Sequence, residues 1–309
     1  MRKRSCPANV DFPIPPGTAW TNTHFDNTCQ AYVAHYTRAE TALEHILRNG
    51  TLQLGPLTVT NDPRETKTWV FTVKSGAPNS QEEYDELQRL ASRNHEYTGL
   101  LKRGCRALCV SCDAPHARKL IFTQRCYGKA RMWAQYADNH QGVCLVFDKV
   151  LLGQAIAGSQ GPGERLVSGE VTYLDFSDLE MGTPEWLTHL DAFGLSGEDL
   201  VKEGLERTLR KSRDKHFRTY FFTKNSDWAS ETEYRWILIG DTDGPEYVEF
   251  GDSLKGIVVG CDFPAARLDE VRGHCDRFGA HFARIRWFNG APDVTWVCPE
   301  DLADSPLFA

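Results

Sequence analysis

The alternation of apolar and polar positions predicts a chain that mixes strands and helices. Residues 31–36 alternate as a strand does, and apolar residues at helical spacing follow them as far as Gly50. The segment 231–239 opens with two acids and ends in an apolar run, so we expect a largely buried strand there. Further strands are expected at 107–112, 143–147, 167–174, 247–250, 255–259 and 285–288, and further helices at 80–97, 129–139, 197–216 and 264–278.

This order of elements is typical of the α+β class. We expect one compact domain over 31–290, preceded by an irregular N-terminal arm at 1–30 and followed by a C-terminal tail at 291–309. The glycine-rich stretch 153–165 is expected to be a loop. The pattern does not decide whether 175–216 forms a lid or a fixed insertion.

The composition, with 41% hydrophobic and 25% charged residues, is that of an ordinary globular protein. A net charge of −7 argues against permanent binding of nucleic acid, because phosphates require a basic surface. No apolar run reaches about 18 residues, so no membrane span is expected. The basic first residues lack a following apolar stretch, so we expect a cytoplasmic protein with reduced cysteines.

A zinc site is one interpretation of four cysteines that lie close in sequence, Cys105, Cys109, Cys112 and Cys126. A closed zinc site requires two close pairs of ligands. The segment 107–111 is instead typical of a buried strand, where free cysteine is common. We therefore expect no metal.

Two acids one residue apart begin the strand at 231–239. If strand geometry already holds there, Glu231, Glu233 and Arg235 share one face. Such a pair of acids at the edge of a buried sheet can steer a cation, polarise a hydroxyl or accept a proton. The alternative is that the acids stay in water and pair with Arg235.

Two other clusters lie where strands meet helices or loops: His35, Tyr36 and Thr37 form one, and Trp133 and Tyr136 the other. A histidine at a strand end can bind a ribose hydroxyl, an aromatic ring can stack on a planar heterocycle, and a carboxylate can stabilise oxocarbenium-like charge. Each cluster also has a structural interpretation. His35 and Tyr36 can be core residues, Trp133 and Tyr136 form the apolar stripe of a helix, and Asn61 can be a turn former.

These positions resemble the ADP-ribosyltransferase superfamily in its His–Tyr–Glu branch. The first match is His35-Tyr-Thr followed by a helix and Ile46-Leu-Arg-Asn-Gly, and the second is Lys129-Ala-Arg-Met-Trp-Ala-Gln-Tyr before a strand. The third is Glu233-Tyr at the start of an apolar strand. Glu231-Thr-Glu is also similar to the two-acid motif of arginine-directed mono-ADP-ribosyltransferases.

More closely, the chain resembles a bacterial and phage family known as domain of unknown function 2971. The shared patterns run from about residue 31 to about residue 260, and they are His35-Tyr-Thr, Asn61-Asp-Pro, 132–144 and Trp228-Ala-Ser-Glu-Thr-Glu-Tyr-Arg.

The resemblance implies an ADP-ribosyltransferase-like split β-sheet core with helical insertions, and an enzyme that uses NAD as co-substrate. It implies an NAD-dependent ADP-ribosyltransferase or NAD glycohydrolase that acts as an effector in conflict between bacteria and phage or between bacteria. Its partners would be an acceptor of unknown kind (protein, nucleic acid or small molecule) and an inhibitor or antitoxin. Glu233 and Glu231 would be catalytic, and the NAD-binding residues would be His35, Tyr36, Thr37, Asn61, Trp133, Tyr136 and Arg235.

Two other functions fit the same residues. A metal-dependent nuclease or phosphohydrolase would use Glu231, Glu233 and a nearby Asp, and a non-catalytic module would bind a nucleotide without turnover. The NAD hypothesis makes one geometric demand: His35, Tyr136 and Glu233 must line one cleft.

Overall fold

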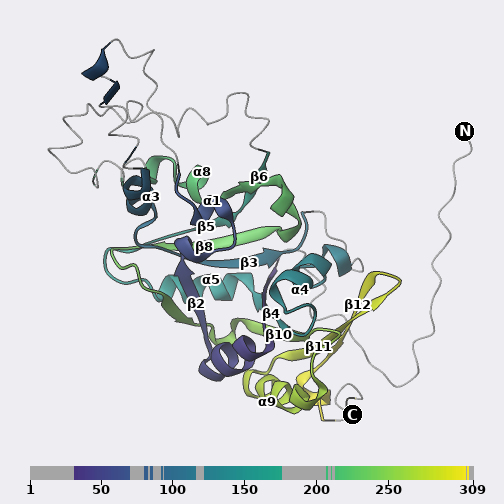
Figure 1. Cartoon of the computed structure of the whole chain (residues 1–309). Helices are drawn as coiled ribbons and strands as arrows, with labels where there is room; N and C mark the ends of the chain where they lie inside the picture. The colour runs from purple at the N-terminus through teal and green to yellow at the C-terminus, as the bar shows by residue number, and fades with distance from the viewer. Residues whose placement is uncertain are drawn as a thin grey trace, which may run out of the picture.

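A ten-stranded, mostly antiparallel sheet forms the centre of the computed structural model of the protein (Figure 1). The structure describes residues 31–69, 80–82, 84–85, 92, 94–115, 122–175, 207, 210, 213–303 and 305. The expected N-terminal arm, part of the helix expected at 80–97 and most of 175–216 lie outside these residues. No helix in the described ranges is long and apolar enough to cross a membrane.

The sheet runs in the order β12-β11-β10-β4-β1-β3, and β3 then pairs with two further branches, β2-β9 and β8-β5. All neighbours are antiparallel except β10 and β11. The strands are β1 Tyr32–Thr37, β2 Thr51–Pro56, β3 Cys105–Cys112, β4 Val143–Asp148, β5 Arg165–Glu170, β8 Glu233–Ile239, β9 Glu246–Glu249, β10 Leu254–Val259, β11 His281–Phe288 and β12 Ala291–Val297. A separate parallel pair joins β6 Thr172–Leu174 to β7 Thr223–Asn225.

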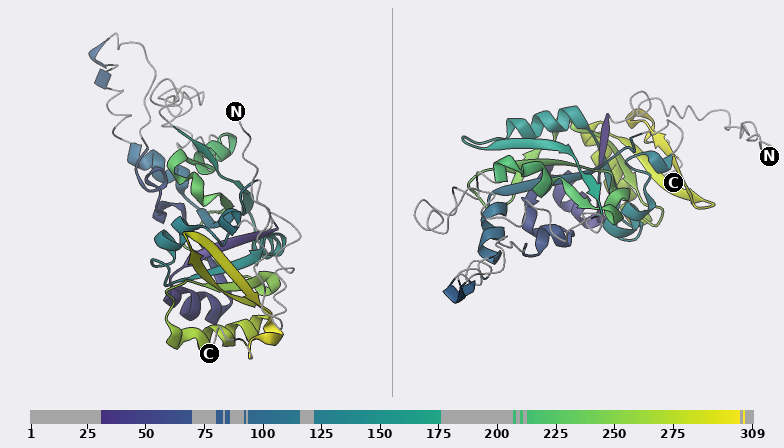
Figure 2. Two further views of the ribbon diagram at one scale, coloured as in Figure 1. Left: turned by 90° about the vertical axis from the view of Figure 1, so that its right-hand side faces the viewer. Right: turned by 90° about the horizontal axis from the view of Figure 1, so that it is seen from above.

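Helices gather at the two ends and on the faces of this sheet (Figures 1 and 2). In Figure 1, η1 and α9 lie at one end, and α1, α3 and α8 lie at the other. The helices are η1 Thr41–Leu47, α1 Pro63–Thr66, α3 Asn94–Lys102, α4 Ala130–Tyr136, α5 Lys149–Gly158, α8 Phe217–Phe221 and α9 Leu268–Phe278. Short 3-10 turns are η2 Leu57–Val59, η3 Phe122–Gln124, η6 Ser226–Glu231, η7 Gly251–Ser253, η8 Ala265–Arg267 and η9 Pro299–Asp301.

The sheet forks at β3. Strand β1 pairs with one end of β3, at Cys112 and Ser111, whereas β2 pairs with the other, at Ala107 and Arg106. On the opposite edge, β8 pairs with β3 continuously from Cys105 to Ser111. Strands β1 and β2 therefore diverge along one edge of β3 and leave the middle of that edge paired with neither.

The expected mixture of helices and strands is confirmed. Several elements differ from the expectation. The strand expected at 167–174 is divided into β5 and β6, which belong to different sheets, because β5 pairs with β8 and β6 with β7. The start of the glycine-rich stretch 153–165 belongs to helix α5. Asp148 caps α5 by accepting hydrogen bonds from the backbone of Val150 and Leu151, and Leu152 and Ile156 pack into the core one turn apart. Capping and burial thus outweigh the low helical propensity of glycine. Residues 291–297, placed by sequence in a C-terminal tail, form β12 and pair along β11.

The pairing of β3 with β8 begins at a tight backbone approach at Gly104, just before β3, where the Gly240 amide donates to the Gly104 carbonyl. The φ angle of Gly104 is +69°, and a Cβ there would lie 1.8 Å from the carbonyl oxygen of Gly240, just after β8. We expect Gly104→Ala to lower the free energy of unfolding by about 2 kcal/mol or more, through backbone strain and overpacking together. Urea denaturation measures this change.

Two other glycines provide matched controls. Gly279 has a φ of +60° and open space around its Cβ position, so Gly279→Ala should cost only the strain, about 1 kcal/mol. Gly273 lies within α9 with open space and an ordinary φ, and Gly273→Ala should cost nothing. Equal effects for Gly104→Ala and Gly279→Ala would contradict the close approach.

Candidate functional site

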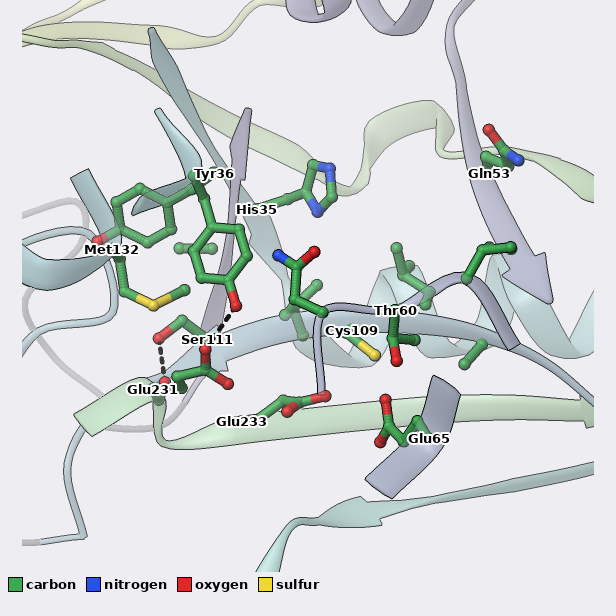
Figure 3. A pocket seen from close by; sticks show the side chains of 18 of the residues that line it. His35, Tyr36, Gln53, Thr60, Glu65, Cys109, Ser111, Met132, Glu231 and Glu233 are labelled. Atoms are coloured by element: carbon green, nitrogen blue, oxygen red, sulfur yellow. Dashed lines mark hydrogen bonds between the residues drawn. The ribbon is translucent and has the colours of Figure 1, made fainter. Parts of the chain in front are cut away.

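A cavity of about 300 Å³ lies in the fork of the sheet (Figure 3). Its walls come from β1, β2, the segment from η2 to α1, the edge of β3, helix α4, strand β7 and the segment that leads into β8. Of the residues expected from the sequence, those that line it are His35, Tyr36, Asn61, Tyr136, Glu231 and Glu233. Thr37, Trp133 and Arg235 are buried and are not part of the lining. The geometric demand that His35, Tyr136 and Glu233 line one cleft is therefore met.

The two acids reach the cavity by a route that the strand pattern did not predict. Glu231 ends the 3-10 helix η6, and Glu233 begins β8. Thr232 between them adopts a left-handed conformation with a φ of +41°. The two carboxylates are therefore brought together by a turn and not by the alternation of a strand.

Lys129 holds this turn against β3. Its buried ammonium donates hydrogen bonds to Ser111 Oγ (2.7 Å), the Cys112 carbonyl (2.7 Å) and the Glu231 carbonyl (2.9 Å). Thr232 Oγ1 also donates to the Cys112 carbonyl at 2.6 Å. Burial lowers the pKa of Lys129 to about 8, so the amine is still largely protonated at pH 7. Thr232, a left-handed, non-glycine residue, is thus held by its own hydrogen bond to the Cys112 carbonyl, and Lys129 fixes that carbonyl and the neighbouring Glu231 carbonyl.

Lys224 joins the two acids. Its Nζ lies 2.9 Å from Glu231 Oε2 and 2.7 Å from Glu233 Oε2, and all three side chains are buried. Burial by itself lowers the pKa of Lys224, but the attraction of Glu233 and Glu231 outweighs it and raises the pKa overall. The other oxygen of Glu231 accepts a 2.6 Å hydrogen bond from the Tyr136 hydroxyl. Tyr136 is therefore positioned by Glu231 at the cavity wall.

Glu233 is held still more firmly. Arg235, fully buried two residues further along β8, binds both of its oxygens, with the Nη2 to Oε2 distance at 3.1 Å. Burial raises the pKa of Glu233, but Arg235 and Lys224 lower it more, to about 2. Arg235 also contacts Glu65 and donates to the Phe221 carbonyl at 2.7 Å. Glu233 is consequently an anion at any physiological pH.

The middle of the β3 edge presents backbone groups to the cavity. The Cys112 amide donates to the Thr232 carbonyl on the β8 side, so alternate residues of β3 turn their backbone groups to the opposite side, and Cys109 is one of these. His35 stands next to this edge. Burial lowers its pKa, and a hydrogen bond with the Cys109 backbone only partly offsets that effect. The imidazole is therefore neutral at pH 7 and can both donate and accept a hydrogen bond.

Tyr36 and Trp133, the other two aromatic residues of the motifs, connect helix α4 to strand β1. The Tyr36 hydroxyl donates to the Cys126 carbonyl at 2.7 Å, and the Trp133 indole donates to the Tyr127 carbonyl at 2.8 Å. Their rings meet edge to face with centroids 5.3 Å apart. Tyr36 and Trp133 thus fix helix α4 on strand β1, which sets the position of Tyr136.

Thr60, Glu65 and Lys224 are among the lining residues that the sequence-based site did not include. Lys224 had a signal, since a lysine seven residues before two acids can pair with them after a turn. Glu65 and Thr60 flank Asp62, which caps α1 through the Arg64 amide, so the segment resembled an ordinary turn. In the described ranges, no group of three or more His, Cys, Asp and Glu side chains could hold a metal ion.

Comparison with known proteins gives one match. A model of the family described as "Protein of unknown function (DUF2971)" matches residues 132–236, which supports the resemblance to that family. The matched stretch contains Tyr136, Lys224, both acids and Arg235, but not His35 or Glu65. No curated protein and no solved structure matches the chain.

The low pKa of Glu233 makes stability dependent on pH in the acid range. A carboxyl with a pKa of about 2 when folded, against 4.5 for the free group, binds its proton more weakly in the native state. The contribution of Glu233 to the free energy of unfolding is therefore complete above about pH 4.5 and is lost as the pH falls towards 2. Over this range the free energy of unfolding changes by up to about 1.4 kcal/mol per pH unit. We expect Glu233→Gln to flatten this slope in urea denaturation between pH 5 and 2.

Glu249 supplies the control, because it is an exposed acid on β9. Glu249→Gln should leave the slope as in the wild type. A Glu233→Gln variant with the wild-type slope would show that Glu233 does not carry this dependence.

Proposed function

We propose that this protein breaks the nicotinamide–ribose bond of NAD and transfers ADP-ribose to an acceptor or to water. The observation that carries the proposal is the convergence of His35, Tyr136, Glu231 and Glu233, from separate parts of the chain, on one cavity. The four residues span about two thirds of the chain, so packing between sequence neighbours does not explain their convergence.

The binding side of the proposal rests on two side chains and on the shape of the sheet. The Tyr136 ring provides a flat surface for the nicotinamide ring. The neutral His35 imidazole can bind a ribose hydroxyl. The forked sheet supports the further proposal of an ADP-ribosyltransferase-like core, because it opens a cavity between diverging strands at the position of His35.

The chemical side rests on charge. When the glycosidic bond breaks, nicotinamide leaves with the bonding electron pair and C1′ of the ribose becomes cationic. Glu233 is already ionised and held by Arg235 and Lys224, so it can stabilise this charge without rearrangement. Glu231 would orient the acceptor or water that forms the new bond to C1′ and take up its proton.

The two rival functions make different demands. A metal-dependent nuclease needs carboxylates free to bind a cation, whereas Lys224 and Arg235 already occupy the positions beside both acids. A non-catalytic module needs only the cavity. We retain the role of an effector in conflict involving bacteria or phage, with an inhibitor or antitoxin as partner, as part of the proposal based on family resemblance.

Incubation with NAD labelled in the adenylate part, with release of nicotinamide measured, tests the proposal. We expect turnover by the wild type and a loss of about 100-fold or more in Glu233→Gln, because a preorganised charge is removed from the transition state. Glu231→Gln should reduce transfer to the acceptor more than it reduces NAD binding. Tyr136→Phe keeps the ring and should bind NAD nearly as well.

Glu249→Gln is the matched control and should be fully active. Activity should survive excess EDTA. Inactivation by EDTA would favour the metal-dependent enzyme, and NAD binding measured by calorimetry without nicotinamide release would favour the non-catalytic module. Absence of both binding and turnover would refute the NAD hypothesis.

A further inference from the structure

The end of the cavity farthest from Tyr136 contains polar groups that the proposed reaction does not use. Figure 3 shows Thr60 and Glu65 together there, with Gln53 above them and Glu231 at the other end. Gln53, Thr60 and Glu65 belong to the segment from β2 to α1, which lies outside the stretch matched by the family model.

Glu65 is the unusual member of this group. It is only 4% exposed and lines the cavity, and Arg235 faces its Oε1 atom. Within the described ranges its Oε2 atom has no hydrogen-bond partner, and neither has the buried hydroxyl of Thr60. A buried polar group without a partner costs about 1–3 kcal/mol, and more when it is charged. Retaining two such groups at the wall of one cavity indicates that they find a partner in a bound molecule.

The charges around Glu65 indicate which kind of partner fits. The three carboxylates of the cavity are Glu65, Glu231 and Glu233, and four buried cations touch them or their backbone: Lys102, Lys129, Lys224 and Arg235. Burial lowers the pKa of Lys102 to about 8, so it too is largely protonated at pH 7. At the Glu65 end of the cavity, Arg235 and Lys102 therefore offset the carboxylate and leave no surplus negative charge to attract a cation, and the carboxylate itself repels an anion.

The partner that fits these charges is therefore a neutral molecule that donates hydrogen bonds. A carboxylate accepts from one hydroxyl, and the neighbouring threonine can accept from or donate to a second. We propose that Glu65 and Thr60 form a subsite for the paired hydroxyls of a ribofuranoside. A cavity of about 300 Å³ is at the lower limit of the range for small-molecule sites, which suits a nucleoside-sized group. The identification of this sugar as a ribose of NAD rests on the proposed function, but the subsite itself does not.

Calorimetric titration of the full chain with ribosides tests the subsite. The probes are adenosine, nicotinamide riboside, ADP-ribose and NAD, together with 2′-deoxyadenosine and 3′-deoxyadenosine. We expect at least one riboside to bind and Glu65→Ala to weaken it about 10- to 100-fold, the effect of removing a hydrogen bond to a charged group. A deoxy analogue that lacks the contacted hydroxyl should bind the wild type and Glu65→Ala equally.

Thr60→Val provides a second variant that keeps the shape of the side chain and should weaken the same riboside, and it carries the test if Glu65→Ala does not fold. Glu249→Gln is the matched control, because Glu249 is an exposed acid on β9 that does not line the cavity. The dissociation constant of the riboside for this control variant should equal that for the wild type.

The outcomes separate this inference from the proposed function. Riboside binding that depends on Glu65, without cleavage of NAD, would support the subsite and refute the NAD reaction. Cleavage of NAD with riboside binding unchanged in Glu65→Ala and Thr60→Val would refute the subsite alone. Failure of every riboside to bind, or binding of the guanidinium compound agmatine in their place, would also overturn it.

Discussion

Two buried cations, Lys224 and Arg235, make it possible for three carboxylates to lie in the interior of this sheet. Removing a single charge from water costs several kcal/mol, and only close opposite charges and hydrogen bonds offset that cost. Arg235 binds both oxygens of Glu233 and also meets Glu65, while Lys224 is shared by Glu231 and Glu233. The candidate site is thus built on a buried ion-pair network.

This network fixes the strand that contains it. Arg235 and Glu233 lie two residues apart on the same face of β8, so both turn inwards together. A shift of β8 by one residue would send both charges to the other face, where Trp236 and Leu238 now pack in the core. The charge pairs therefore specify the register of β8 on β3, in addition to fixing the Glu233 carboxylate at the cavity wall.

The fork at β3 supplies the other requirement, which is space. Because β1 and β2 pair with opposite ends of the same edge, the middle of that edge and the side chains around it face a hollow. Lys129 supports the turn beside this hollow, because it helps to hold Thr232 in its left-handed conformation. Charges that are preorganised in this way suit a reaction in which positive charge develops on the substrate, since no groups have to move when the charge appears.

The sequence by itself determined the elements and several members of the site. Period-2 and period-3.6 patterns placed β1, β3, β4, β8 and α4 within a few residues, because these elements bury one face or both and the pattern records burial. His35, Tyr136, Glu231 and Glu233 were found for a related reason: each is a polar or aromatic residue at the end of an apolar run.

Tertiary structure alone decided which of these residues face the cavity. Trp133 and Tyr136 lie on the same helix and looked equivalent, yet Trp133 packs on Tyr36 and Tyr136 binds Glu231. Thr232 replaces the expected strand geometry between the two acids by a turn, because its left-handed φ is stabilised by Lys129, about a hundred residues away. The sequence did not decide whether Glu65 meets a ligand, since its role depends on Arg235, which is distant in sequence. Local patterns report whether a side chain is buried; which partner it meets there depends on long-range contacts that no local pattern contains.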